Sequence, residues 1–343
     1  MPLHNIRERS MAFSQSYQLF AQLFLSPQKP SLYEEILSLA DINALQIPQS
    51  LVKDSDEAAA THYHIFNLET LPYESVFLED SLLAGGHRTL LLQQAYQSFT
   101  CNILPQKVEA DHISTQLSFL SDLSAQLAKA PEQTSPAMTR QIELSTQHFL
   151  QDHLLSWLPA YIESLNPKNA EKQYHDAFIF FQEVTLFILQ VASEHRHDLQ
   201  GTDASFAERG ASQCILDSPE CRIADIAKHF STPTLCGAFL RRSDIQAIGR
   251  FLDLPSGFGP RADMLNMLFT CAAEYGSFER LLSQLQNHLE KAKEFHQAKT
   301  QDDYWAAICT ENIHRLGTLR SQAKDFIRSN STKTGHSASS INV

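Results

Sequence analysis

The sequence predicts an all-α protein in which a helical bundle domain is followed by a smaller helical domain. Glycine accounts for only 11 of the 343 residues, so the turn chemistry that many-stranded folds need is scarce. Apolar residues recur at spacings of three and four along most of the chain, which is the period of a helix that buries one face. Short proline-marked connections between these segments favour antiparallel packing of neighbouring helices.

The first part of the chain carries the clearest helical stripes. One stripe ends before Pro27, and another occupies positions 113, 117, 120, 124 and 127. A third runs through Phe149 and Trp157, and we expect it to stop at Pro159 or soon after because proline removes a backbone hydrogen bond. A fourth stripe runs from Tyr174 to Val191.

The periodic pattern lapses between about residues 200 and 225, which indicates a domain boundary. Helical periodicity returns over residues 225–328, where we expect Ser243 and Gln246 to form the capping box of a helix that Pro255 ends. The last residues, 329–343, are too polar to pack and are expected to be disordered. The predicted organisation is a bundle at 1–200, a helical extension at 225–328 and a tail at 329–343.

The negative charge of the chain is concentrated in its first part. Residues 1–200 hold 11 Lys and Arg against 23 Asp and Glu, whereas the remaining residues hold 16 of each, so the whole net charge of −12 belongs to the first part. Such a surface disfavours nucleic acid as a partner and suits a basic ligand. Charge alone is equally compatible with a role in solubility.

The six cysteines and the hydropathy of the chain point to the cytoplasm. No CxxC pair occurs, and Cys214 and Cys221 are too far apart for a zinc knuckle, so neither a disulfide framework nor a structural metal is expected. No window resembles a signal peptide or about 18 uninterrupted apolar residues. We therefore expect a cytoplasmic protein without stable membrane insertion.

Asp111 and His112 stand directly before the stripe that begins at residue 113. They could form a catalytic pair, half of a metal site, or the capped start of a helix. Adjacent helical residues point about 100° apart and do not naturally address one atom. The favoured interpretation is an Asp whose carboxylate accepts backbone N–H groups of its own helix, next to a locally packed His. No HExxH or GxSxG motif supports an enzyme.

The segment at residues 69–80 mixes acids with aromatic and aliphatic residues. Glu69, Glu74, Glu79 and Asp80 surround apolar residues that include Tyr73. This mixture suits a peptide that is both basic and hydrophobic. An ordinary amphipathic connection would have the same composition, and the residues alone do not decide between the two.

Five segments in chain order resemble the TorD/DmsD/NarJ family of cytoplasmic chaperones for molybdoenzymes. They are YQLFAQLFLSP at 17–27, YHIF at 63–66, LPYESVFL at 71–78, ADHISTQLSFLSDL at 110–123 and HFLQDHLLSWLPAY at 148–161. The resemblance implies a TorD-like helical bundle that has no catalytic reaction and no cofactor or metal of its own. Residues 225–328 resemble an extension found on some longer members.

The resemblance also implies the partners. They are the twin-arginine signal peptide and the immature, cofactor-free catalytic subunit of a molybdopterin oxidoreductase, which the chaperone holds until its cofactor is inserted while export is delayed. Members of the family can also exchange helices to form homodimers. An acidic first domain suits two guanidinium groups followed by an apolar stretch.

The residues that match the family's motifs are the candidates for the peptide-binding face: Tyr63, Phe66, Tyr73, Glu74, Ser75, Phe77, Glu109, Asp111 and His112. The family's central motif, Glu-Pro-x-Asp-His, is carried only by its Asp-His end, because Val108 and Glu109 stand where Glu and Pro would fall. Two other classes stay open: a helical adaptor for folded partners, and a metal-dependent hydrolase that uses Asp111 and His112.

Overall fold

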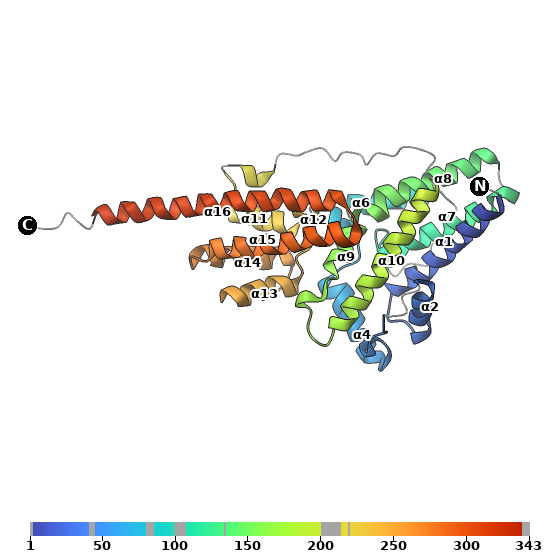
Figure 1. The fold of residues 1–343 in the computed structure, drawn as a ribbon, viewed down its shortest axis with the longest axis horizontal. Coiled ribbons are helices and arrows are strands. Elements are labelled where there is room, and N and C mark those ends of the chain that lie inside the picture. The colour runs from blue at the N-terminus through green and yellow to red at the C-terminus, as the bar shows by residue number, and fades with distance from the viewer. Residues whose placement is uncertain are drawn as a thin grey trace, which may run out of the picture. The chain divides into compact units, whose positions relative to one another are not determined.

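A computed structural model describes residues 3–40, 45–79, 86–97, 99, 108–133, 135–199, 214–218 and 220–337. The chain divides into two compact units, Met1–Gly210 and Ala211–Val343. The described residues are helical with no strand, which confirms the all-α prediction (Figure 1). They contain one isolated antiparallel bridge, between Tyr73 and His112.

Unit 1 is a bundle built around four long helices. Its elements are α1 (Leu3–Leu23), α2 (Pro30–Ala40), α3 (Gln49–Val52), α4 (Ser55–Tyr63), the π-helix η1 (His64–Glu69), α5 (Glu74–Leu78), α6 (His87–Gln97), α7 (Ile113–Gln133), α8 (Pro136–Phe149), the π-helix η2 (Leu150–Leu154), α9 (Leu155–Ser164), the 3-10 turn η3 (Pro167–Asn169) and α10 (His175–Leu199). Among the described helices, α1 and α7 make the most extensive contact with each other.

The packing of α1 against α7 combines an apolar stripe with small polar residues. Ser121 Oγ donates to the Ser14 carbonyl oxygen at 2.8 Å across this contact. Tyr17 and Phe20 on α1 and Trp157 on α9 are all fully buried. Small residues at the crossing let the helices approach closely, and the aromatic residues fill the interior on either side.

The helix through Trp157 was expected to stop at Pro159 or soon after, and it continues past the proline and ends at Ser164. Pro159 lies inside α9, which continues to Ser164 and follows directly on the π-helix η2. Helices accommodate proline next to such an irregularity in their hydrogen-bond ladder. Trp157, Leu158 and Tyr161 are fully buried on both sides of the proline, so packing outweighs the lost hydrogen bond.

Helix α10 is the one described helix that is long and apolar enough to cross a membrane by length and composition. In this structure 56% of its most apolar window is buried inside the protein. A helix at the centre of a bundle has the same composition because it contacts neighbours on several sides. The α10 side chains Phe178, Phe180 and Phe181 are fully buried accordingly.

Unit 2 is a second helical assembly with its own core. Its elements are the 3-10 turn η4 (Ile215–Asp217), α11 (Ile223–Ser231), α12 (Pro233–Cys236), α13 (Arg242–Leu252), α14 (Arg261–Glu274), α15 (Phe278–Phe295), the π-helix η5 (His296–Thr300) and α16 (Asp303–Ser337). α15 packs along α16, and α11 packs on α14. Leu265, Phe269 and Leu285 lie in the shared apolar core.

Two details of unit 2 differ from the sequence-based expectations. The start of α13 is capped by Asp244 and not, as expected, by Ser243 with Gln246. The Asp244 carboxylate accepts from the Arg241 backbone N–H at 3.0 Å and from Arg241 Nε at 3.1 Å. The helix begins one residue before Ser243, which puts Asp244 at the position that reaches back to the cap. Helix α16 continues to Ser337, beyond the expected end of the extension at residue 328. The disorder of the tail at 329–343 stays a prediction.

Candidate functional site

Two segments far apart in the sequence cap each other's helices at one corner of unit 1. Pro72 fixes an extended approach to α5, and its carbonyl oxygen accepts from the backbone N–H of Ile113, the first residue of α7, at 2.9 Å. In return, the Asp111 carbonyl oxygen accepts from the backbone N–H of Glu74, the first residue of α5, at 3.0 Å. We call residues 72–75 with 109–113 the motif corner.

The Asp111 carboxylate is the centre of the motif corner and is completely buried. Its Oδ2 accepts from Ser75 backbone N–H at 3.2 Å and from Ser75 Oγ at 2.5 Å, and its Oδ1 accepts from Thr89 Oγ1 at 3.0 Å. The expectation that Asp111 caps its own helix was wrong. It caps α5 instead and ties α6 to the same point, because α7 begins only at Ile113 and directs the carboxylate toward Ser75.

His112 performs the capping role on α7. Its Nδ1 accepts from the Ser114 backbone N–H at 3.2 Å, so the ring stands in for the side-chain oxygen of an ordinary N-cap. The ring packs edge-to-face on Tyr73 with centroids 4.8 Å apart. Burial, and then the nearby His62, lower the pKa of His112 from 6.5 to about 3, so the ring is neutral at physiological pH and keeps its acceptor.

Glu74 is also completely buried, in a polar network that joins four helical elements. Its carboxylate lies 3.2 Å from Arg88 Nη1 and 3.2 Å from His153 Nδ1, and it accepts from Gln116 Nε2 at 2.6 Å. Gln116 Oε1 in turn accepts from Trp157 Nε1 at 3.3 Å. A buried carboxylate with this many partners holds α5, α6, α7 and η2 in register.

The remaining candidate residues fall into two groups. Phe66 and Phe77 are core residues: Phe66 packs edge-to-face on Phe181, and Phe77 packs in the same way on Tyr161. Tyr63 lies at the end of α4 with 56% of its surface exposed and takes no part in the hydrogen bonds of the motif corner. The motif corner therefore contains six of the nine candidate residues. Tyr63, Phe66 and Phe77 lie outside it.

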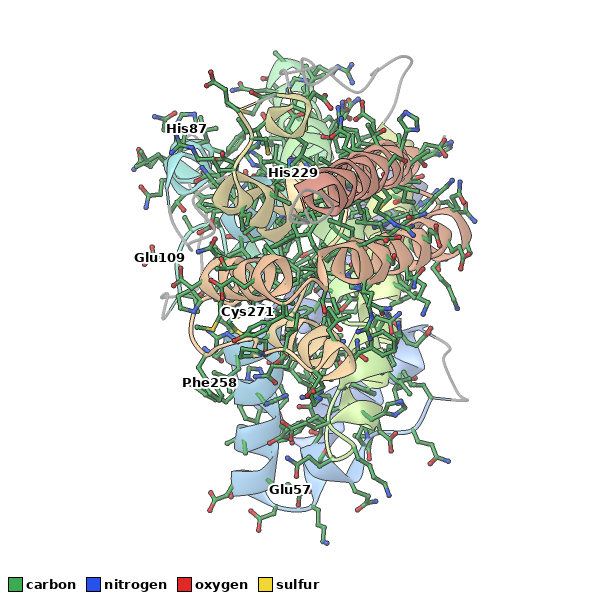
Figure 2. The ribbon with its side chains drawn as sticks, turned by 90° about the vertical axis from the view of Figure 1, so that its left-hand side faces the viewer. Glu57, His87, Glu109, His229, Phe258 and Cys271 are labelled. Carbon is green, nitrogen blue, oxygen red and sulfur yellow. The ribbon has the colours of Figure 1, made fainter. Side chains whose placement is uncertain are left out.

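Glu109 and Tyr73 form the accessible edge of the motif corner. Glu109 is exposed, and its side chain projects from the surface in Figure 2. Tyr73 is half-buried, and its pKa is raised by burial and then by the carboxylates of Asp111 and Glu109. An exposed acid beside an accessible aromatic ring is chemically able to hold a guanidinium group next to an apolar side chain.

The sequence interpretation missed four polar residues that complete this region: Arg88, Thr89, Gln116 and His153. Gln116 lies inside the segment 110–123 that carries the resemblance, so the sequence already pointed to its neighbourhood. Arg88 and Thr89 lie near the start of α6 and belong to none of the segments that carried the resemblance. Only the fold brings them to the two carboxylates.

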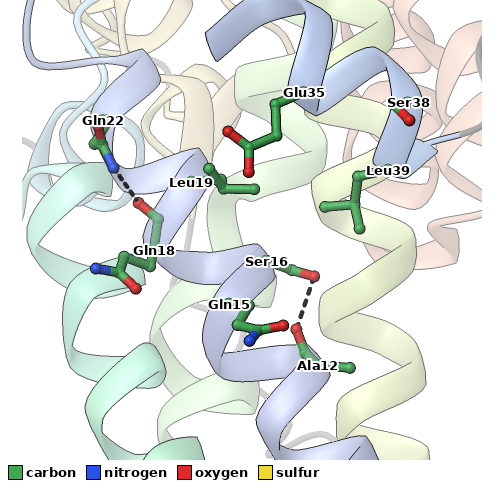
Figure 3. Close-up of a pocket in the computed structure, with 9 residues that line it drawn as sticks. All are labelled: Ala12, Gln15, Ser16, Gln18, Leu19, Gln22, Glu35, Ser38 and Leu39. Atoms are coloured by element: carbon green, nitrogen blue, oxygen red, sulfur yellow. Dashed lines mark hydrogen bonds between the residues drawn. The ribbon is translucent and has the colours of Figure 1, made fainter. Parts of the chain in front are cut away.

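A second surface feature is a shallow groove of about 700 Å³ between α1 and α2. It is lined by Ala12, Gln15, Ser16, Gln18, Leu19, Gln22, Glu35, Ser38 and Leu39 (Figure 3). Gln22 Nε2 and Ser16 Oγ donate to carbonyl oxygens of α1 itself. No candidate residue of the motif corner lines this groove.

No group of three or more His, Cys, Asp or Glu side chains is placed to hold a metal ion in the described parts of the chain. At the motif corner, His112 uses Nδ1 for a backbone bond and Asp111 uses both carboxylate oxygens for hydroxyl and amide donors. The pair is thus arranged as two helix caps. Unit 1 is thus a helical bundle with a buried polar corner, at whose accessible edge lie an acid and an aromatic residue, Glu109 and Tyr73.

Comparison with known proteins shows what unit 1 is similar to. Residues 34–163, which contain the motif corner, match the family described as nitrate reductase delta subunit. The chain is 24% identical over 180 residues to the chaperone protein TorD of Psychrobacter sp. (strain PRwf-1), covering 51% of this chain and 76% of that protein. It is 23% identical over 192 residues to the chaperone protein TorD of Aliivibrio salmonicida (strain LFI1238), covering 54% and 83%.

Unit 1 is therefore similar both to the nitrate reductase delta subunit family and to TorD chaperones, which confirms the resemblance seen in the sequence. No solved structure matches the chain significantly.

Proposed function

We propose that this protein is a chaperone for the maturation of a molybdoenzyme and that unit 1 binds the client. The client is the twin-arginine signal peptide, the cofactor-free catalytic subunit of a molybdopterin oxidoreductase, or both. Binding holds the subunit while its cofactor is inserted and delays its export from the cytoplasm. The chaperone performs no reaction of its own. The family match of residues 34–163 and the two TorD relatives support this role.

The observation that carries the proposal is the motif corner. Two of the five segments that carry the family resemblance, 71–78 and 110–123, are joined through the Asp111 carboxylate. Buried Asp111 and Glu74 give this corner a fixed shape, while Glu109 and Tyr73 remain accessible at its rim. We assign the client guanidinium to Glu109 and the apolar residues after it to Tyr73, in keeping with the acidic charge of the first 200 residues.

The test is a titration of the purified protein with twin-arginine signal peptides of the molybdoenzymes encoded in the same organism, each beside its Lys-Lys variant. We expect one peptide to bind, and we expect salt and the Lys pair to weaken that binding, because lysine cannot form the bidentate contact. Absence of binding to every peptide would contradict the signal-peptide proposal. The same titration with the immature catalytic subunit then decides between the two forms of the client.

The site assignment has its own matched variants. Glu109→Gln should raise the Kd by about threefold, as expected for one exposed ion pair. Glu57→Gln is the control, because it removes one exposed carboxylate from α4, well away from Glu109 in Figure 2. Equal effects of the two variants would remove Glu109 from the binding face and leave only the overall acidity of unit 1.

A further inference from the structure

Unit 2 contains a cysteine, a histidine and an asparagine in one hydrogen-bonded row. Cys214 immediately precedes η4, His229 lies on α11 and Asn312 lies on α16. Cys214 Sγ is 3.9 Å from His229 Nδ1, and His229 Nε2 is 2.7 Å from Asn312 Oδ1. The row is separate from the motif corner, which belongs to unit 1.

The hydrogen bonds of Asn312 fix the tautomer of His229. Asn312 Nδ2 donates to the carbonyl oxygens of Leu235 at 2.8 Å and of Ile308 at 3.0 Å. The amide oxygen of Asn312 must therefore face His229, and His229 Nε2 must carry the proton that it donates. The lone pair of the neutral ring is then on Nδ1, the atom directed at the Cys214 thiol.

The surroundings of His229 keep its ring neutral. The residue is only 3% exposed. Its pKa is lowered, first by burial and then by the Arg315 guanidinium, whereas the bond to Asn312 and the charge of Asp217 act in the opposite direction. Arg315 is itself paired with Asp217, with Nε 3.4 Å from Oδ1. A neutral imidazole with a free Nδ1 can accept a proton from a neighbouring thiol.

Cys214 differs from His229 in being accessible. It is half-buried and is a free thiol, as is Cys221, which lies near it at the edge of the same apolar core. The pKa of Cys221 is raised by burial and then by Asp225 and Cys214, which disfavours its nucleophilic thiolate form. Of these two half-buried thiols, Cys214 is the one whose sulfur faces the imidazole.

We propose that Cys214 is a nucleophilic thiol and a covalent modification site for small soft electrophiles, with His229 as its general base and Asn312 as the positioning residue. With an alkene activated by a carbonyl group, the thiol proton moves to His229 Nδ1 while the sulfur forms a bond to the β carbon. The alkene π electrons move to the carbon next to the carbonyl group, which then takes the proton back from His229. The step needs no oxidant, and its product is a thioether.

The test is the rate at which each cysteine of the full-length protein reacts with limiting N-ethylmaleimide, mapped by peptide mass spectrometry. Cys271 is a half-buried free thiol on α14 and serves as the internal reference. We expect Cys214 to react at least about tenfold faster than Cys271 near neutral pH, a modest share of what a positioned base can supply. Equal rates in the wild-type protein would overturn the proposal without any variant.

Variants then separate a base from a merely structural histidine. His229→Gln should reduce the Cys214 rate to that of Cys271 and abolish its separate pH dependence, while His314→Gln, at an exposed position on α16, should change neither. Asn312→Ala should lower the rate and move the midpoint of its pH profile, because the ring tautomer is no longer fixed. If Cys214 reacts with N-ethylmaleimide at an unchanged rate in folded His229→Gln protein, the role of His229 is overturned. If that variant does not fold, the comparison of Cys214 with Cys271 in the wild-type protein decides.

Discussion

Replacing Asp111 by alanine removes the carboxylate that joins α5 and α6 at the motif corner. Three donors lose their acceptor at once: the Ser75 backbone N–H, Ser75 Oγ and Thr89 Oγ1. The site is completely buried, so water cannot replace the carboxylate without opening the corner. The free energy of unfolding of unit 1 should fall accordingly.

The magnitude follows from the number and kind of bonds. Hydrogen bonds to a charged acceptor contribute roughly 1.5–3 kcal/mol each, but the two hydroxyl groups can turn toward other acceptors, so the sum is an upper bound. We expect a loss of about 4 kcal/mol. Asp54→Ala provides the comparison, because Asp54 is an exposed N-cap of α4 that accepts from the Asp56 backbone N–H at 2.8 Å. That cap should contribute about 1 kcal/mol.

The assay must report on unit 1 alone, since a two-unit protein need not unfold in one step. The chain has two tryptophans, Trp157 in unit 1 and Trp305 in unit 2. In a Trp305→Phe background, urea unfolding followed by tryptophan fluorescence therefore reports on unit 1. If Asp111→Ala loses no more stability than Asp54→Ala in this background, the carboxylate is an ordinary cap and the account of the motif corner is wrong.

Three further predictions concern acid stability, a buried charge and a glycine. His112→Asn keeps a cap acceptor but removes a group whose pKa falls from 6.5 to about 3 on folding. The unfolded state binds the extra proton, so the contribution of this group to wild-type stability is fully present above about pH 6.5 and falls toward pH 3, by up to about 1.4 kcal/mol per pH unit. Urea unfolding at several pH values should therefore show a shallower dependence of stability on pH in the variant, and an unchanged slope would contradict this account of His112. Glu74→Lys should destabilise unit 1 by about 3 kcal/mol or more, because it buries an ammonium group beside the Arg88 guanidinium; wild-type stability in this variant would contradict the network. Gly237→Ala should lower the stability of unit 2 by about 2 kcal/mol or more, measured through Trp305 fluorescence in a Trp157→Phe background, because φ is +89° and the new Cβ would lie 2.6 Å from Cys309 N. Gly317→Ala, with open space around its Cβ, should be neutral or stabilising.

The helical architecture could be predicted because it depends on apolar spacing that each helix carries in its own sequence. The stripe at residues 113–127 became α7, and Leu117 and Leu120 are fully buried on it. The position at which α9 ends was harder to predict, because the rule for an internal proline is local, while α9 is held by the burial of Trp157 and Tyr161 on both sides of Pro159. A local rule fails where tertiary packing contributes more free energy than one backbone hydrogen bond.

The polar corner could be predicted only in part, for the same reason. The family motifs pointed to Ser75 and Asp111, and the structure joins them. The direction in which the Asp111 carboxylate points could not be obtained from its position before a helix, because the competing donors lie on α5 and α6, more than 20 residues away in the chain. Thr89 has no local signal at all, and only the packing of α6 brings it to the carboxylate.

The burial of the two corner carboxylates changes how client recognition should be tested. Glu74 and Asp111 are completely buried and already hold internal donors, so a client arginine that reached them would have to displace Arg88 or break the caps of α5. Substituting either acid would thus disturb folding and binding together. Glu109 is exposed beside Tyr73, so its carboxylate can be removed without opening the core. An effect of Glu109→Gln on peptide affinity at unchanged stability would therefore separate recognition from the architecture that supports it.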